Sequence, residues 1–386
     1  MVDREAASLP ALYYEPAAGG HRAQFLSAIL RYGGDDWVVA APQTLLQRLS
    51  DDVRKRLAVE GGPVAFHSIE ELPGLPGVEI WRRSLALARR IGCKRIFHPC
   101  LDPLILASPR FPETPDIELS GIFFRPMIHY CDHGGVRERF TASAKDFLFR
   151  RFLARRDVAN VLTLDRYFAR LATERYALQG GKVAYLPDLT PFSPSLPDAA
   201  AVAGSAGHPD GQKTRFLLFG ALQRRKGVYQ VLDAVERLAP EVASHIEVRF
   251  CGQVFADVAD LPACIVSLSA RSPAALYLKN RFLSQNELAA EVARCDVILA
   301  TYQRHRGSSG VLYWAAAFGK PLIAQSYGLV GREVCEFALG GAIDTTKPDA
   351  IAAAMARPPS INLDRANAYL EGHSEAEFAK RVRAAC

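Results

Sequence analysis

A basic turn that follows an apolar run is the part of the chain best suited to chemistry. Residues 216–219 (FLLF) are continuously apolar, as is typical of a parallel strand that is covered on both faces. Gly220 ends the run, and Arg225 and Lys226 precede a segment, 228–238, whose apolar residues recur at helical spacing. This arrangement suits a phosphate, because backbone N–H groups, the helix dipole and the cations all favour an anion there. The alternative is a basic turn without a ligand.

A second cationic loop, RHRGSSG, lies further along the chain. It places Arg304 and Arg306 before a Ser-Ser-Gly stretch, Ser308, Ser309 and Gly310, which opens a segment of helical pattern. Either serine could cap that helix and leave N–H groups for an anion. We expect this loop to hold a diphosphate together with Lys226. The alternative is a capped surface helix with solvated arginines.

The composition is ordinary for a globular protein and indicates two domains. A chain of 386 residues exceeds the size at which one hydrophobic core keeps growing. No apolar run approaches the roughly 20 residues of a membrane span, and the first ten residues lack the blocks of a signal peptide. The eight cysteines are scattered singly without a C-x-x-C pair, which indicates neither a zinc site nor a disulfide framework. A cytoplasmic location is therefore expected.

The positive charge is concentrated in one part of the chain. Residues 82–156 contain 15 Lys and Arg against 7 Asp and Glu, a local balance of +8, while the whole chain carries +6. No nucleic-acid reader motif accompanies this excess, so no nucleic-acid partner is expected.

Strand-like runs alternate with helical patterns through both halves of the chain. This rhythm predicts an α/β protein with open, mostly parallel sheets, in which ligands bind at the carboxyl ends of the strands. The pattern restarts at residue 216, and the later strand-like runs include IEVRFCG, IVSLSA, ALYLKN and CDVILATY. The stretch 197–212 is rich in Ala, Gly and Pro, which indicates a linker or mobile loop.

Several motifs of the second half occur in a familiar order. An F-G-x-L-x-x-x-K-G pattern runs from Phe219 to Gly227, the strand VRFCG ends in Gly252, and NELAAEVARCDVIL follows. A helix of small residues then runs into GKPLIA and GLVGREV. In this order the motifs resemble the nucleotide-binding domain of glycosyltransferase family 4 (group 1), which has the GT-B fold. The resemblance covers about 215–355, and EPAAGGH at 15–21 is similar to the glycine loop of such enzymes.

The resemblance implies two Rossmann-like domains that face each other across a cleft. We expect an acceptor-side domain over 1–195, a linker or mobile loop over 196–213 and a nucleotide-sugar-binding domain over 214–360. A C-terminal helix within 361–386 could pack back on the first domain. The family uses a nucleotide-diphosphate sugar as co-substrate, so neither a further cofactor nor a metal is expected.

One departure from the family pattern concerns the donor site. Family members usually carry two glutamates eight residues apart, one contacting the donor sugar and the other the ribose. Counting back from Gly319, those positions hold Arg306 and Trp314. Base recognition in this fold often uses backbone groups, and we expect it near Asn280 and Arg281.

The resemblance also suggests residues in the first half. His98 resembles the histidine often found after a strand of the family, Arg125 ends a strand where the family often has a histidine facing the donor sugar, and His129 lies just beyond. These three are the catalytic candidates, although each taken singly could be a packed or exposed loop residue. Candidates for the acceptor side or cleft are Gly19, Gly20, His21 and Asp188, with a surface-loop histidine and a turn cap as alternatives.

The segment Lys145–Arg156 interleaves aromatic and cationic residues. On a helix, Leu148, Phe149, Phe152 and Leu153 share a face, and Arg150, Arg151 and Arg155 lie mostly around it. Such a helix could rest on anionic lipid at the inner face of the membrane. The alternative is a domain helix whose apolar face lies in the core.

Together these observations predict a glycosyltransferase. It would move a sugar from a nucleotide-diphosphate sugar to a glycan or lipid-linked acceptor, with retention and without a metal, in the biosynthesis of a cell-surface polysaccharide. A catalytically degenerate GT-B protein that acts as a binding or scaffold module is the alternative.

Overall fold

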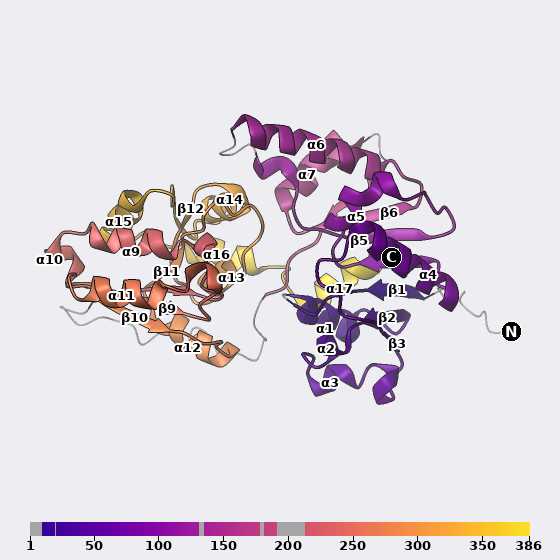
Figure 1. Ribbon diagram of the computed structural model, residues 1–386, viewed down its shortest axis with the longest axis horizontal. Helices are drawn as coiled ribbons and strands as arrows, with labels where there is room; N and C mark the ends of the chain where they lie inside the picture. Colours follow the sequence, from indigo (N-terminus) through magenta and orange to yellow (C-terminus); the bar gives the residue numbers. More distant parts are fainter. Residues whose placement is uncertain (1–9, 20, 131–134, 178–180, 191–212) are drawn as a thin grey trace. The chain divides into compact units, whose positions relative to one another are not determined.

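The computed structural model describes residues 10–386 except 20, 131–134, 178–180 and 191–212, and the chain forms two compact units (Figure 1). Unit 1 extends to Leu189 and includes Gly372–Cys386, and unit 2 comprises Thr190–Glu371. Gly20 and nearly all of the predicted linker lie outside the described residues.

Unit 1 is built on a seven-stranded parallel sheet in the order β3-β2-β1-β4-β5-β6-β7. Its strands are β1 (Ala11–Tyr14), β2 (Trp37–Ala41), β3 (Ala65–Ser68), β4 (Arg95–His98), β5 (Glu118–Phe123), β6 (Val158–Thr163) and β7 (Val183–Tyr185). The helices are α1 (Arg22–Tyr32), α2 (Gln43–Leu46), α3 (Asp51–Arg54), α4 (Gly77–Ile91), α5 (Asp102–Ala107), α6 (Val136–Leu153), α7 (Arg166–Arg175) and α17 (Glu375–Ala384). Three 3₁₀ turns complete the described part, η1 (Ala58–Glu60), η2 (Ser108–Arg110) and η3 (Met127–Tyr130).

Helices cover both faces of this sheet, which explains why strands such as β1 and β2 are buried along their whole length. Successive side chains of a strand point to opposite faces. In β1, Leu12 and Tyr14 accordingly pack into the core beneath α4, α5, α6 and α7, whereas Tyr13 packs into the core beneath α1 and α17. The segment after unit 2 thus completes unit 1, because α17 contributes Phe378 to the second core.

Unit 2 repeats the design with a six-stranded parallel sheet in the order β10-β9-β8-β11-β12-β13. Its strands are β8 (Thr214–Phe219), β9 (Ile246–Cys251), β10 (Ala275–Lys279), β11 (Val297–Ala300), β12 (Leu322–Gln325) and β13 (Gly340–Ile343). Its helices are α9 (Val228–Glu236), α10 (Pro240–Ala243), α11 (Leu261–Ser269), α12 (Gln285–Arg294), α13 (Gly310–Ala317), α14 (Gly328–Glu336), α15 (Pro348–Ala356) and α16 (Leu363–Leu370), with 3₁₀ turns η5 (Arg224–Lys226) and η6 (Ala256–Val258).

The predicted α/β class and parallel sheets are confirmed, but one strand prediction is wrong. IVSLSA lies in and just after helix α11, not in a strand. Its apolar residues continue a helical pattern that begins upstream, because Leu261, Ile265 and Leu268 share the buried face. Pro262 in the first helical turn favours this start.

The predicted C-terminal segment 361–386 divides between the units. Helix α16 belongs to unit 2, whereas α17 belongs to unit 1 and packs against α1. Phe378 stacks on Phe25 with ring centroids 4.9 Å apart. Within the described residues, no helix is long and apolar enough to cross a membrane.

The face of α6 that contains Phe149, Phe152 and Leu153 packs in the core and is not available to lipid. Phe149, Phe152 and Leu153 are each completely buried. Arg155 is also buried, and its guanidinium forms an ion pair of 2.6 Å with Asp157. Of the two interpretations of this segment, the structure agrees with a domain helix whose apolar face lies in the core.

Candidate functional site

The candidate site of unit 2 lies at the carboxyl ends of β8 and β11. The order of the sheet reverses between these two neighbouring strands, since β9 lies on one side of β8 and β11 on the other. Open parallel sheets bind ligands at such reversal points. Gly220 directly follows β8 with a φ of +91°, a left-handed conformation that suits glycine.

Lys226 lies directly over this glycine. Its Nζ is 3.1 Å from the position that a Cβ on Gly220 would occupy, and it donates a hydrogen bond of 2.7 Å to the carbonyl of Phe219. The same ammonium lies 5.3 Å from the ring centroid of Tyr302 and 5.8 Å from that of Phe219. An ammonium has three N–H donors, so a phosphate could bind without breaking the bond to Phe219.

The turn that carries Lys226 is attached to the end of β11. Thr301 Oγ1 donates to the carbonyl of Lys226 over 2.9 Å, and the amide of Gln303 donates to the carbonyl of Arg225 over 2.7 Å. Gly227 makes this approach possible, because a Cβ there would lie 2.1 Å from the carbonyl oxygen of Thr301. The close packing fixes the height of Lys226 above the sheet.

The loop 304–310 is held by side chains from the ends of other strands. Gln325 at the end of β12 donates to the carbonyls of His305 and Tyr327 over 2.5 and 2.7 Å. The hydroxyl of Tyr327 accepts a hydrogen bond from the amide of Arg304 and donates one of 3.0 Å to the carbonyl of Tyr302. Thr345 Oγ1 donates to that same carbonyl over 2.7 Å. The loop is therefore pre-organised by its surroundings.

Tyr302 connects this loop to the lysine. Its ring lies 4.9 Å from the His305 ring, and its hydroxyl is 2.6 Å from Ser309 Oγ. Ser309 is the N-cap of α13, and its Oγ accepts a hydrogen bond of 3.3 Å from the amide of Val311. Tyr302 thus contacts both the N-cap of α13, through its hydroxyl, and the Lys226 ammonium, through its ring.

The structure separates the predicted diphosphate residues into two groups. Gly220, Lys226 and Ser309 lie around Tyr302 as described, and Gly310 begins α13. Arg225 and Arg304 are exposed, and Arg225 donates to the side chain of Gln223 over 2.8 Å. Ser308 contributes its carbonyl, which is 3.0 Å from His305 Nε2. Arg306 is half-buried and its carbonyl accepts from the amide of Leu329 over 3.3 Å.

Trp314, which the sequence resemblance aligns with a glutamate of the family, lies in the core. Trp314 is 3% exposed, and its ring packs edge-on against Phe219 at 6.4 Å. A carboxylate at position 314 would be buried, whereas the tryptophan packs against Phe219 at the end of β8.

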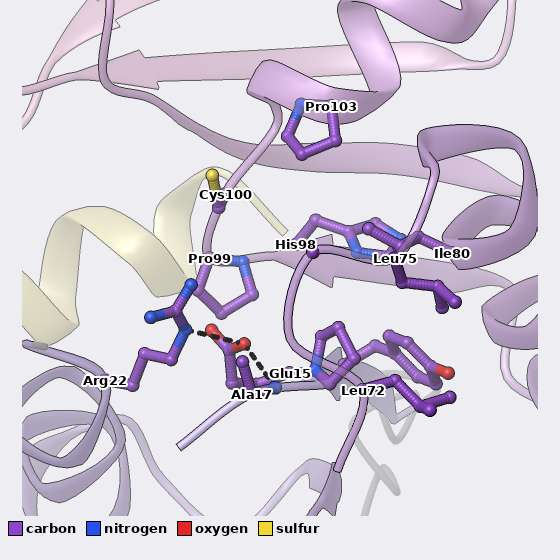
Figure 2. A pocket seen from close by; sticks show the side chains of 13 residues that line it. Glu15, Ala17, Arg22, Leu72, Leu75, Ile80, His98, Pro99, Cys100 and Pro103 are labelled. Carbon is purple, nitrogen blue, oxygen red and sulfur yellow. Dashed lines mark hydrogen bonds and ion pairs between the residues drawn. The ribbon is translucent and has the colours of Figure 1, made fainter. Parts of the chain in front are cut away.

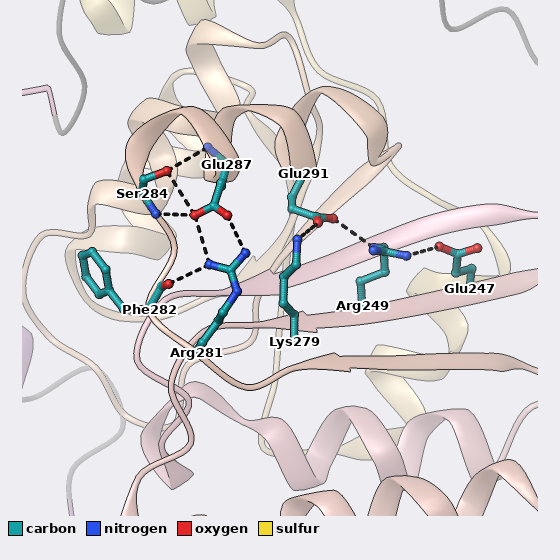
Figure 3. A network of polar contacts seen from close by, with 8 residues as sticks. All are labelled: Glu247, Arg249, Lys279, Arg281, Phe282, Ser284, Glu287 and Glu291. Atoms are coloured by element: carbon teal, nitrogen blue, oxygen red, sulfur yellow. Dashed lines mark hydrogen bonds and ion pairs between the residues drawn. The ribbon is translucent and has the colours of Figure 1, made fainter.

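The residues suggested for the base, Asn280 and Arg281, directly follow β10, and Arg281 lies beside a network of ion pairs (Figure 3). Asn280 Oδ1 accepts a hydrogen bond of 2.8 Å from the amide of Val254. Arg281 pairs with Glu287, and this pairing lowers the pKa of Glu287 to about 2. Next to it, Glu291 accepts from both Lys279 and Arg249. These pairs hold α12 against the strand ends.

In unit 1 the glycine loop after β1 is anchored by a buried ion pair (Figure 2). Glu15 is 2% exposed, pairs with Arg22 Nε over 2.8 Å and accepts from the amide of Ala17 over 3.0 Å. Arg22 in turn donates to the carbonyl of Gly19 over 2.6 Å. Burial outweighs these contacts and raises the pKa of Glu15 to about 7.

A small cavity of about 90 Å³ opens beside this ion pair. Its lining includes Glu15, Arg22, His98 and Cys100. His98 ends β4, is 1% exposed, and its Nε2 is 3.1 Å from Ser84 Oγ. Burial lowers the pKa of His98 to about 3 and raises that of Cys100 to about 12, so both side chains are neutral at pH 7.

The other candidates of unit 1 are dispersed. His129 is buried and its Nε2 is 2.6 Å from Asp165 Oδ2, a carboxylate that also caps α7. Arg125 is exposed just after β5, and His21 is exposed at the start of α1, next to Phe25. Asp188 is buried, and its carbonyl is 2.8 Å from His373 Nδ1.

The sequence did not predict four residues that hold the loop 304–310 in place, namely Tyr302, Gln325, Tyr327 and Thr345. The signal that could have found them is their position, because each stands at or just after the carboxyl end of β11, β12 or β13. In the described part of the chain, no cluster of three or more His, Cys, Asp or Glu side chains could hold a metal ion.

The comparisons with known proteins agree with this architecture. Residues 213–358 match the family model described as glycosyl transferases group 1. No curated protein matches the chain in sequence.

Several solved structures share the fold over nearly the whole chain. HepE from Anabaena, in complex with UDP, is 14% identical with a TM-score of 0.58, covering 97% of this chain and 98% of its own. WaaG, a glycosyltransferase involved in lipopolysaccharide biosynthesis, is 14% identical with a TM-score of 0.57 and the same coverages. Sucrose-phosphate synthase from Thermosynechococcus elongatus is 13% identical with a TM-score of 0.57, and the match covers 98% of this chain and 94% of that one. The chain therefore has the predicted GT-B fold, and its residues 213–358 are similar to the group 1 glycosyl transferases.

Proposed function

We propose that the protein transfers a sugar from a nucleotide-diphosphate sugar to a glycan or glycolipid acceptor. The observation that carries the proposal is the position of Lys226 next to Gly220 and to Tyr302, whose hydroxyl contacts the N-cap of α13. The ammonium and the helix N-terminus each favour an anion, and both lie near the reversal point of the sheet. The UDP and UDP-glucose complexes of HepE support a nucleotide sugar as the ligand.

The chemistry that this site can perform is the stabilisation of a departing diphosphate. In the transfer, the bond between the anomeric carbon and the diphosphate oxygen breaks, a bond to an acceptor oxygen forms, and the acceptor proton is released. Negative charge grows on the diphosphate during this step. The Lys226 ammonium and the α13 dipole are fixed before the reaction, so they stabilise that charge without reorganisation. We propose that transfer proceeds with retention and without a metal.

The proposed setting is the cytoplasm, at the inner face of the membrane, in the assembly of a cell-surface polysaccharide or glycolipid. The likeness to WaaG, which is involved in lipopolysaccharide biosynthesis, supports this choice of acceptor. The residues of the acceptor site are proposed to include the glycine loop anchored by Glu15 and Arg22.

The first experiment is a thermal-shift panel of UDP, GDP, dTDP, ADP and CMP without added metal. A nucleotide present at 100 times its Kd should stabilise unit 2 by roughly 2.7 kcal/mol. Lys226→Met keeps the aliphatic stem between the two rings but removes the charge, and we expect it to abolish that shift and reduce donor turnover at least ~100-fold.

Arg237→Ala is the matched control, because Arg237 is an exposed cation that follows the far end of α9 and pairs with Asp349. It should bind the nucleotide as the wild type does. Full turnover by Lys226→Met would remove the proposed diphosphate site. Nucleotide binding without transfer to any acceptor would instead favour a degenerate GT-B protein with a binding role.

A further inference from the structure

Helix α6 presents a second apolar face, opposite the one that packs in the core. Val136, Phe140 and Phe147 are 88%, 76% and 59% exposed. At 100° per residue their directions fall within a sector of about 40° on the helix. The buried residues Ala142, Phe149, Phe152 and Leu153 lie on the other side. An 18-residue helix with apolar side chains on both faces needs a second explanation besides the core.

Cations border this outer face on both sides. Arg137, Arg139 and Arg151 are all exposed, and the guanidinium of Arg151 lies 5.9 Å from the centroid of the Phe147 ring. The acidic residues of the helix are engaged elsewhere, because Glu138 caps the backbone of Gly135 and Asp146 pairs with Arg150 and Arg175. The exposed face therefore combines insertable aromatic rings with positive charge.

We propose that this outer face of α6, defined by Val136, Phe140, Phe147 and the three bordering arginines, docks on an anionic lipid bilayer. Phenylalanine rings partition into the boundary between headgroups and acyl chains, while arginines reach the lipid phosphates beside them. A second copy of the chain would bring the same positive rows together, and the like charges would oppose association. Figure 1 shows α6 at the edge of unit 1.

The choice of a lipid surface rests in part on the proposed glycolipid acceptor, whereas the docking can be measured without turnover. It also differs from the sequence interpretation of Lys145–Arg156, which directed Phe149 and Phe152 to the lipid. The structure buries those two rings and leaves the other face of the helix for the bilayer.

Flotation of the full chain with vesicles tests the proposal. One set contains 30% phosphatidylglycerol in phosphatidylcholine, and the other is pure phosphatidylcholine. We expect binding to the first set only, weakened as salt is raised. The double variant Phe140→Ser/Phe147→Ser should lower the bound fraction at least ~10-fold, because it removes the inserting rings. The triple variant Arg137→Gln/Arg139→Gln/Arg151→Gln should lose the preference for anionic vesicles.

Phe282→Ser is the matched control, because Phe282 is an 82% exposed phenylalanine of unit 2, and it should bind vesicles as the wild type does. Wild-type protein that stays off anionic vesicles, or a double variant that binds them equally well, would overturn the proposal. A dimer in sedimentation that only the double variant abolishes would assign the face to a second copy instead. Nucleotide thermal shifts of the same variants keep this outcome separate from the proposed transferase function.

Discussion

Lys226 and Glu15 show how burial and neighbours set the chemistry of single residues. Lys226 is held over Gly220 by the carbonyl of Phe219, which directs its ammonium to the carboxyl end of the sheet. Glu15 stands at the corresponding end of β1 but is almost completely buried, so its carboxylate depends on one arginine for compensation. A backbone carbonyl thus positions the Lys226 ammonium, and burial raises the pKa of the Glu15 carboxyl group.

The burial of Glu15 predicts a specific pH dependence of stability. Its pKa of about 7 in the folded protein exceeds the ordinary value of 4.5. The folded state therefore holds a proton that the unfolded state has lost, and stability falls as pH rises from about 4.5 to about 7. The size of this change is roughly 3 kcal/mol.

Glu15→Gln isolates this effect, since the amide does not titrate but can still accept from Ala17. We expect the unfolding free energy of the wild type, minus that of the variant, to fall across this pH range and to level off above it. Urea unfolding followed by the fluorescence of Trp37 and Trp81 in unit 1 measures the difference. A difference that stays constant with pH would contradict the prediction. Glu174→Gln, at an exposed position of the same unit, serves as the control.

At the scale of elements, the candidate site depends on a tight junction between η5 and β11. Hydrogen bonds from Thr301 and Gln303 fasten the turn to the strand end. Gly227 has a φ of +76° and lies against the carbonyl of Thr301, so both its conformation and the lack of a side chain are needed. Because the backbone of Arg225 and Lys226 is hydrogen-bonded to the residues after β11, the position of Lys226 depends on that of β11.

Gly227→Ala should therefore destabilise unit 2 and weaken nucleotide binding. The left-handed conformation costs an alanine about 1–2 kcal/mol, and the added methyl group would lie 2.1 Å from a backbone oxygen unless the turn moves. We expect a total loss of at least ~2 kcal/mol together with a smaller thermal shift by the nucleotide.

Gly61→Ala is the control for strain alone, because Gly61 has a φ of +83° and nothing within 4 Å of the added methyl group. This substitution should lower the unfolding free energy only by the cost of the left-handed conformation, about 1–2 kcal/mol. Equal losses from the two substitutions would show that the close approach of η5 to β11 does not matter.

For the molecule as a whole, the chain leaves unit 1, forms unit 2 and returns. Helix α17 is the returning segment and seals one face of the first sheet through Phe378, which is 1% exposed and stacks on Phe25. Arg95 further binds the carbonyl of Cys386 over 2.5 Å, which ties the last residue to β4. The stability of unit 1 thus depends on a segment that follows unit 2 in the sequence.

Phe378→Ala should lower the unfolding temperature of unit 1 and spare that of unit 2. Replacing a buried phenylalanine by alanine typically costs about 3–5 kcal/mol of unfolding free energy, and we expect a loss of this size for unit 1. Calorimetry without and with the stabilising nucleotide assigns each transition, since the proposed nucleotide site lies in unit 2. Phe282→Ala, at an exposed phenylalanine, should change neither transition. A parallel shift of both transitions would mean that the units do not unfold separately.

The sequence by itself determined the elements and the lysine turn. FLLFG predicted β8 because a strand covered on both faces is apolar throughout, and Gly220 and Lys226 marked the turn because their spacing is local. IVSLSA shows the limit of such patterns, since a short apolar run also fits a helix that begins at Leu261.

Only the tertiary structure decided what surrounds these elements. Tyr302, Gln325, Tyr327 and Thr345 follow three different strands and meet because parallel strands end at one edge of a sheet. Tertiary contacts also decide which face of α6 points outward, because a helix that is apolar on two sides could bury either side. Its core partners, which include Phe123 and Phe168, come from β5 and α7 and select Phe149 for burial. Contacts between segments distant in the chain settle such choices, and local patterns do not contain them.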